Sequence, residues 1–138
     1  MAAVAAFCKS IKKYYPTTRS RLNYVSALNK AFGAKISDIP GVHINSGPDC
    51  SPYIINVSFP GIPGETIVNM LSSEDIYVGT GSACSQKLKR PDRTVLSISN
   101  SKDIASSSIR ISLSAATTSA ELDKLCAALR KVRTLCMM

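Results

Sequence analysis

The amino-acid sequence predicts an α/β protein of the two-layer α+β kind, with helices covering a small sheet of three or four strands. Three observations lead to this prediction. The chain has 138 residues, the length of one ordinary domain, and its 45% of hydrophobic residues can build a core. Residues 53–59 and 107–114 alternate apolar and polar side chains with the period of a β-strand. Segments with helical spacing precede, separate and follow these two stretches.

Two helices are expected at the N-terminus. The first covers residues 2–15, ends before Pro16 and carries apolar side chains on one side, namely Val4, Phe7, Cys8 and Ile11. Thr17 or Thr18 can cap the second helix, and Gly33 suits the position just past its end. Its apolar residues with a spacing of three and four are Leu22, Val25, Leu28 and Phe32.

Short strands and one helix should follow. The stretch "IPGVHIN", residues 39–45, indicates a first short strand, and residues 53–59 form the second. After the turn "PGIPGE", a helix over residues 64–73 is expected to point Ile67, Met70 and Leu71 toward the core. The stretch "IYVGT", residues 76–80, is typical of a third strand.

The C-terminal part combines a polar loop, a strand and the clearest helix. Residues 85–106 are rich in serine and predict a long loop in which only "TVLSI" is apolar. In the strand over 107–114, Arg110 points away from the apolar face. Thr118 and Glu121 form a capping box for a helix over 118–133. The residues expected to point inward include Ile55, Val57, Ile111, Leu113, Leu125 and Leu129.

The net charge of +8 is unevenly distributed along the chain. Residues 1–37 hold seven Lys or Arg and no acidic residue, whereas residues 38–138 hold ten basic and nine acidic residues. A solvated helix face, a nucleic-acid-binding segment and an organelle transit segment all fit this pattern. The solvated face is favoured because the aromatic interleaving of single-strand binders is missing.

The cysteines indicate a reducing compartment. Five of them occur at irregular spacing, and no C-x-x-C pair suggests zinc or a redox dithiol, so we expect no metal site. No run approaches the roughly 20 apolar residues that span a bilayer, and the N-terminus is a poor secretory signal. We therefore expect a soluble protein without membrane contact in the cytoplasm, with an organelle as the alternative.

Cys84 is the candidate nucleophile. It follows the flexible positions Gly79 and Gly81, and four basic residues come soon after it, namely Lys87, Lys89, Arg90 and Arg93. Nearby positive charge lowers the pKa of a thiol and raises its thiolate fraction. An ordinary small buried cysteine fits these local features equally well.

Four other cysteines, one histidine and one arginine complete the candidates. Arg110 could bind a carboxylate through two parallel hydrogen bonds, although a solvated strand arginine is the simpler interpretation. His43, the only histidine, is interpreted as structural. Cys8 and Cys126 lie on apolar helix faces and are expected in the core, while Cys50 and Cys136 are expected in a loop and the tail.

Four stretches together resemble the C-terminal small domain of cysteine desulfurases, enzymes of the class V aminotransferase group that depend on pyridoxal phosphate (PLP). In chain order they are "IPGVHIN", "INVSFPGIPGETIVNML", "GSACS" and "SSIRISLSAATTSAELDKL". The likeness covers about residues 38–133, and residues 1–37 match only as helices. It divides the chain into a basic helical segment, 1–37, and a small domain of the kind found in fold-type I PLP enzymes, 38–138.

The resemblance implies a role for each candidate. Cys84 corresponds to the loop cysteine that attacks the sulfur of PLP-bound L-cysteine, becomes a persulfide and releases alanine. Arg110 corresponds to the arginine that holds the substrate carboxylate. The long loop after "SACS" resembles the branch that passes sulfur to acceptor proteins for iron–sulfur cluster assembly or tRNA thiolation. Enzymes of this family are homodimers.

One departure from the family pattern limits what this chain can do. The family's PLP-binding lysine directly follows a histidine in a large preceding domain, but His43 is followed by Ile44, and 138 residues leave no room for that domain. We therefore expect no PLP site in this chain alone and expect a large domain or partner chain to complete it. A fragment, a natural truncation and half of a split enzyme remain open. The alternatives in function are a PLP-free sulfur-relay or scaffold module and a basic nucleic-acid-binding domain.

Overall fold

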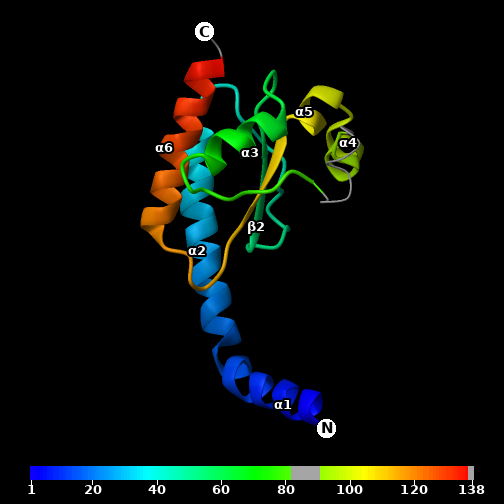
Figure 1. Cartoon of the computed structure of the whole chain (residues 1–138), viewed down its shortest axis with the longest axis vertical. Coiled ribbons are helices and arrows are strands. Elements are labelled where there is room, and N and C mark those ends of the chain that lie inside the picture. The colour runs from blue at the N-terminus through cyan, green and yellow to red at the C-terminus, as the bar shows by residue number, and fades with distance from the viewer. Residues whose placement is uncertain (82–90, 137–138) are drawn as a thin grey trace.

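A small antiparallel sheet lies at the centre of the fold. The structure is a computed structural model that describes residues 1–81 and 91–136. The strands in these residues are β1 (His43–Ile44), β2 (Ile54–Ser58) and β3 (Ser108–Ser112). They pair antiparallel in the order β1-β2-β3. With its helices, this sheet confirms the predicted α/β fold with three strands (Figure 1).

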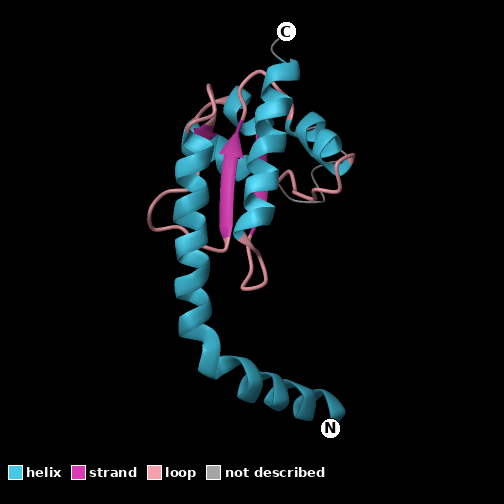
Figure 2. Ribbon diagram, turned by 90° about the vertical axis from the view of Figure 1, so that its left-hand side faces the viewer, coloured by secondary structure: helices cyan, strands magenta, loops and turns pink. Residues whose placement is uncertain are grey.

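Three helices cover one face of this sheet. They are α2 (Thr18–Ser37), α3 (Gly64–Ser72) and α6 (Ser119–Cys136), and each contributes buried apolar residues to a single core. Figure 2 shows the two long helices, α2 and α6, side by side in front of the sheet. The opposite face of the sheet carries mainly polar side chains, among them Asn56 and Arg110. In the described part of the chain no helix is long and apolar enough to cross a membrane.

The core confirms the predicted strand register. Ile55 of β2 pairs with Ile111 of β3, and both side chains are 2% exposed, whereas Arg110 between the two inward residues of β3 is exposed. A slip of one residue would have reversed this arrangement. All six residues expected to point inward are buried, namely Ile55, Val57, Ile111, Leu113, Leu125 and Leu129.

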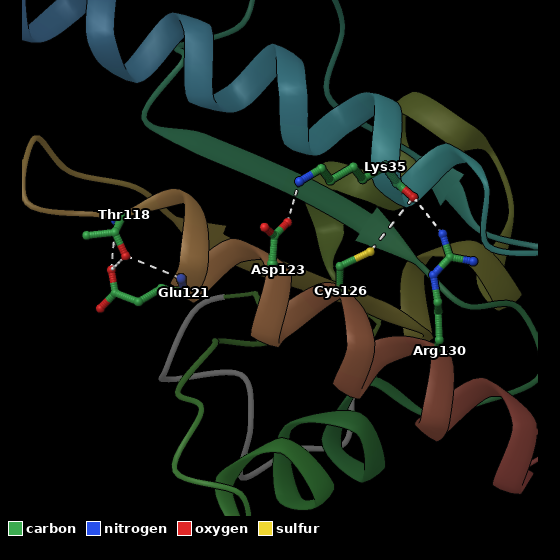
Figure 3. A network of polar contacts seen from close by, with 6 residues as sticks. All are labelled: Lys35, Thr118, Glu121, Asp123, Cys126 and Arg130. Atoms are coloured by element: carbon green, nitrogen blue, oxygen red, sulfur yellow. Dashed lines mark hydrogen bonds and ion pairs between the residues drawn. The ribbon is translucent and has the colours of Figure 1, made fainter.

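The start of α6 confirms the predicted capping box. The Thr118 backbone N–H donates to Glu121 Oε2 at 2.7 Å, and the Glu121 N–H donates to Thr118 Oγ1 at 3.3 Å (Figure 3). The hydrogen bonds from the Thr118 backbone and then from its hydroxyl lower the pKa of the Glu121 carboxyl. This cap is therefore fully formed above the ordinary pKa of glutamate and weakens as the pH falls through the lowered value.

Polar contacts further along α6 join it to α2. The Lys35 carbonyl accepts hydrogen bonds from Cys126 Sγ at 3.8 Å and from Arg130 Nη2 at 3.2 Å. Lys35 Nζ also pairs with Asp123, and all of these contacts are visible in Figure 3. The Lys35–Asp123 pair is about half exposed, so most of the stability of this helix pair comes from the apolar side chains beneath it.

Two predictions on element boundaries are wrong. Gly33 does not end its helix, because α2 continues to Ser37, where the buried side chain of Ile36 packs in the core. The third predicted strand, residues 76–80, is reduced to one bridge between Gly79 and Arg110. Glycines in and after this stretch weaken the preference for a longer strand.

The predicted loop over residues 85–106 is also wrong for its second half, while residues 82–90 lie outside the described part. Two short helices occur there, α4 (Arg93–Ser99) and α5 (Lys102–Ser106). The Asp92 side chain accepts from the backbone N–H groups of the first turn of α4, and Ser101 does the same for α5. A serine of the kind that suggested a loop, Ser101, and the neighbouring Asp92 therefore cap helices.

The first helix confirms its expected extent but not its expected burial. Helix α1 (Ala2–Tyr14) is followed by the short 3-10 helix η1 (Tyr15–Thr17), which contains Pro16, and continues into α2 at an angle (Figures 1 and 2). No residue of α1 is buried. Cys8, which was expected in the core, is exposed, because this helix lies away from the core and packs none of its side chains into it.

Two glycines give a matched test of the packing. A Cβ atom added to Gly64 would lie 2.6 Å from the Ser108 carbonyl oxygen, whereas one added to Gly33 would meet nothing within 4 Å. We expect Gly64→Ala to destabilise the fold by about 1–3 kcal/mol through forced backbone movement. Gly33→Ala, inside α2, should stabilise it by about 0.5–1 kcal/mol. Denaturant unfolding measures both free energies, and changes of the same sign would contradict the close approach at Gly64.

Candidate functional site

Arg110 lies on the polar face of the sheet, opposite the helices. It is exposed and stands across from Asn56, in a row of cross-strand pairs on this face that also includes Ser58 with Ser108. The structure describes two ion pairs, Lys35–Asp123 and Lys131–Glu74, so no described carboxylate pairs with the Arg110 guanidinium. A free guanidinium on an open surface can receive a carboxylate through two parallel hydrogen bonds.

The backbone of Arg110 is hydrogen-bonded to the backbone of Gly79. The Gly79 N–H donates to the Arg110 carbonyl at 3.0 Å, and the Arg110 N–H donates to the Gly79 carbonyl at 2.6 Å. A Cβ atom at Gly79 would lie 3.6 Å from Arg110 Nη2, so the guanidinium extends over this glycine. The segment that leads toward Cys84 in the sequence is therefore anchored beside Arg110.

Cys84 itself lies outside the described residues, as do Lys87, Lys89 and Arg90. The described residues on either side of this gap are close to each other, since a Cβ atom at Gly81 would lie 2.5 Å from Asp92 Oδ2. The Asp92 carboxylate also accepts hydrogen bonds from two backbone N–H groups of α4. Both ends of the segment with Cys84 are thus fixed on the Arg110 side of the domain, and the role of the thiol stays a prediction.

The sequence patterns did not predict a cluster of hydrogen-bonded polar side chains beside Arg110. Asn45 Nδ2 donates to Asn56 Oδ1 at 2.6 Å and to Ser58 Oγ at 2.7 Å, and Ser58 Oγ donates to the Ile104 carbonyl at 2.7 Å. The ring of His43 contacts Asn45 Oδ1 at 2.9 Å. Strand alternation already places Asn56 on the face of Arg110 and could have indicated the cluster, but the pairing of the strands was not known.

The remaining cysteine and histidine predictions have mixed outcomes. Cys126 is buried, as expected, and Cys50 and Cys136 are exposed. His43 lies in β1 and contacts Asn45 of the polar cluster, in line with a structural role. In the described residues no group of three or more His, Cys, Asp or Glu side chains could hold a metal ion.

The described residues do not fit PLP on their own. A PLP site of this kind needs a lysine amine that bonds to the cofactor. Every lysine that the structure describes lies on a helix, namely on α1, α2, α5 or α6, and none lies on a strand of the sheet. The described strands of this sheet therefore carry a guanidinium, that of Arg110, but no lysine amine.

Comparison with known proteins shows one consistent family. The model of the family described as aminotransferase class-V matches residues 1–125. A NifS/IcsS protein homolog of Lactobacillus delbrueckii subsp. bulgaricus is 30% identical over 134 residues, which are 96% of this chain and 35% of that protein. The cysteine desulfurase IscS of Pseudomonas putida is 32% identical over 116 residues, 80% of this chain and 28% of the relative.

The solved structures agree with these relatives. A NifS-like protein matches with a TM-score of 0.73 and 27% identity over 88% of this chain and 30% of its own. The chain thus spans about a third of the length of the proteins it matches. The family match begins at residue 1, so it includes α1 and α2, which the resemblance in sequence had matched only as helices.

Proposed function

Because the chain belongs to the class-V aminotransferase family, we propose that it is the C-terminal domain of a cysteine desulfurase. In this proposal it supplies the sulfur-accepting thiol of Cys84 and the carboxylate-binding guanidinium of Arg110. Relatives that bear the names NifS and cysteine desulfurase support the proposal. In this proposal, the part of the enzyme that binds PLP lies outside the region that this chain shares with its relatives.

The observation that carries the proposal is the exposed guanidinium of Arg110 on the polar face of the sheet. Arg110 has no carboxylate partner among the described residues. Its backbone forms hydrogen bonds with that of Gly79, which lies five residues before Cys84 in the sequence. An amino-acid substrate held by its carboxylate at Arg110 would present its side chain near the segment that carries the thiol. This arrangement suits L-cysteine, whose sulfur lies three bonds from its carboxylate carbon.

The proposed transfer balances without an external oxidant. The Cys84 thiolate attacks the sulfur of L-cysteine, the bond between that sulfur and its carbon breaks, and a new S–S bond forms on Cys84. The carbon that loses sulfur takes up a proton, so that the products are alanine and a persulfide. Breaking this bond needs an electron sink, which PLP supplies when bound and which the described residues do not.

The fate of the persulfide sulfur is part of the proposal. A persulfide can pass its outer sulfur to a second protein, so we include sulfur-acceptor proteins for iron–sulfur cluster assembly or tRNA thiolation among the proposed partners. We also propose that the enzyme is a homodimer in a reducing compartment such as the cytoplasm. The accessible thiols of Cys8, Cys50 and Cys136 are consistent with a reducing environment.

Reconstitution tests the proposal directly. We expect the 138-residue chain with added PLP to release no alanine from L-cysteine. Co-expression with the unmatched portion of the Lactobacillus delbrueckii relative should restore alanine release and the visible absorbance of lysine-bound PLP. Turnover by the chain alone would contradict the proposal. A chain that takes sulfur from a persulfide donor onto Cys84, yet never releases alanine with the added portion, would instead be a sulfur relay.

A further inference from the structure

Asn56 of β2 is the direct cross-strand neighbour of Arg110 on the polar face of the sheet. The Leu113 N–H donates to the carbonyl of its own partner Tyr53 at 2.7 Å, so that pair exchanges backbone hydrogen bonds. Pairs with and without backbone hydrogen bonds alternate along an antiparallel ladder, so the pair of Asn56 and Arg110, three positions away, is of the kind without them. Side chains of such pairs approach each other more closely, with Cβ atoms about 4.5–5.5 Å apart.

A chain of hydrogen bonds beside this pair has a fixed direction. The Ile104 carbonyl can only accept, so the single hydroxyl proton of Ser58 is donated to it, at 2.7 Å. Ser58 Oγ therefore accepts from its other neighbour, and the Asn45 atom 2.7 Å away is the amide nitrogen Nδ2. The second proton of this nitrogen goes to the Asn56 side chain at 2.6 Å, and the Asn56 atom that receives it is the oxygen Oδ1.

This direction determines which end of the Asn56 amide is available. Asn45 and Arg110 lie on opposite sides of Asn56, because β2 is the central strand between β1 and β3. Since Oδ1 is bonded on the side of Asn45, the Nδ2 group is on the side of Arg110. No described group accepts a hydrogen bond from Nδ2, and among the described residues no buried side-chain nitrogen or oxygen lacks a partner, so Nδ2 reaches solvent.

We propose that Asn56 Nδ2 donates a hydrogen bond to the substrate carboxylate that Arg110 holds, and that Asn45 is the positioning residue that orients Asn56. The inference rests on the proposed function, because it extends the carboxylate site of Arg110. A carboxylate has about four acceptor positions, and two parallel bonds from a guanidinium use two of them. The remaining positions allow a neutral donor such as Asn56 to bind the same group.

The tautomer of His43 reports the direction of the hydrogen-bond chain without any activity measurement. His43 Nδ1 lies 2.9 Å from Asn45 Oδ1, and an amide oxygen can only accept, so Nδ1 carries the proton. We expect ¹⁵N NMR of the 138-residue chain at about pH 8, where imidazole is ordinarily neutral, to show mainly the Nδ1–H tautomer. A mainly Nε2–H tautomer would mean that both amides are turned round, which would place the Asn56 oxygen beside Arg110 and overturn the proposal.

Asn56→Asp tests the donor with almost no change of shape. The variant keeps an oxygen that accepts from Asn45, but it replaces Nδ2 with a negatively charged oxygen beside Arg110. In the chain co-expressed with the unmatched portion of the Lactobacillus delbrueckii relative, we expect KM for L-cysteine to rise about 30-fold or more, because a hydrogen bond to a charged group is lost and the new carboxylate competes for the guanidinium. The value of kcat should stay within about threefold, since the variant leaves the thiol unchanged.

Asn29 provides the matched control. It lies on α2, on the other side of the sheet, and its Nδ2 donates to the Pro52 carbonyl at 2.8 Å. Asn29→Asp makes the same atomic change, so we expect lower stability but a KM within about twofold of the wild-type value. Thermal unfolding of each variant measures the structural effect separately. An unchanged KM in folded Asn56→Asp, or an equal rise of KM in Asn29→Asp, would overturn the proposal.

Failure of this inference and failure of the proposed function give different results. If the reconstituted enzyme releases alanine only when Cys84 is present, but its KM does not respond to Asn56→Asp, Asn56 does not bind substrate and the function stands. If no reconstituted pair releases alanine, or if the release does not depend on Cys84, the proposed function is wrong. The substrate-binding role of Asn56 is then wrong too, whichever tautomer His43 has.

Discussion

We expect Cys84→Ser to lower alanine release from L-cysteine by about a thousandfold or more in the reconstituted enzyme. The hydroxyl of serine is a far weaker nucleophile than a thiolate and cannot store sulfur as a persulfide. PLP should remain bound, because the cofactor is held by the added portion. The visible absorbance of the bound cofactor and the amount of alanine released measure the two effects separately.

Cys50 provides the matched control for this result. It is an exposed cysteine on the loop before β2, and Cys50→Ser makes the same atomic change at a position outside the segment between Gly79 and Asp92. We expect this variant to retain full activity. Mass spectrometry should find the added sulfur on Cys84 in the wild-type and Cys50→Ser proteins. Persulfide on Cys50 or full activity of Cys84→Ser would show that another thiol accepts the sulfur.

The second large effect is expected for Arg110→Ala, which should raise KM for L-cysteine by about 10- to 150-fold in the reconstituted enzyme. The range corresponds to the loss of about 1.5–3 kcal/mol for hydrogen bonds to a charged group. Arg110→Lys keeps the charge but loses the two parallel donors, so its KM should lie between those of the wild type and the alanine variant. Steady-state kinetics of alanine release gives both values.

Arg130 is the control for the loss of an exposed arginine. It lies on α6 and donates to the Lys35 carbonyl, so Arg130→Ala removes the same side chain far from the polar sheet face. We expect its KM to be unchanged and its stability slightly lower. An unaltered KM in Arg110→Ala, with normal thermal unfolding, would remove Arg110 from the substrate site.

The sequence alone predicted the structure correctly where a local residue pattern and the burial that this pattern requires agreed. The alternation of apolar residues in 107–114 placed Ile111 inside and Arg110 outside, since the period of a strand leaves only two faces. The capping box of Thr118 and Glu121 marked the start of α6 for a similar reason, because it satisfies the free N–H groups of the first turn with neighbours in the chain. The family resemblance also came from motifs that are contiguous in sequence.

Features that depend on which segments meet in space were decided only by the tertiary structure. Gly33 suggested a helix end, yet α2 continues past it because the buried side chain of Ile36 favours another turn. Residues 76–80 have a strand-like sequence but meet β3 only at Gly79, and a strand exists only where a partner lies alongside. The apolar spacing of α1 predicted a helix correctly and its burial wrongly, because spacing defines a face but not what covers it. For the same reason, the link between Asn45, Asn56 and Ser58 beside Arg110 became visible only when β1, β2 and β3 were paired.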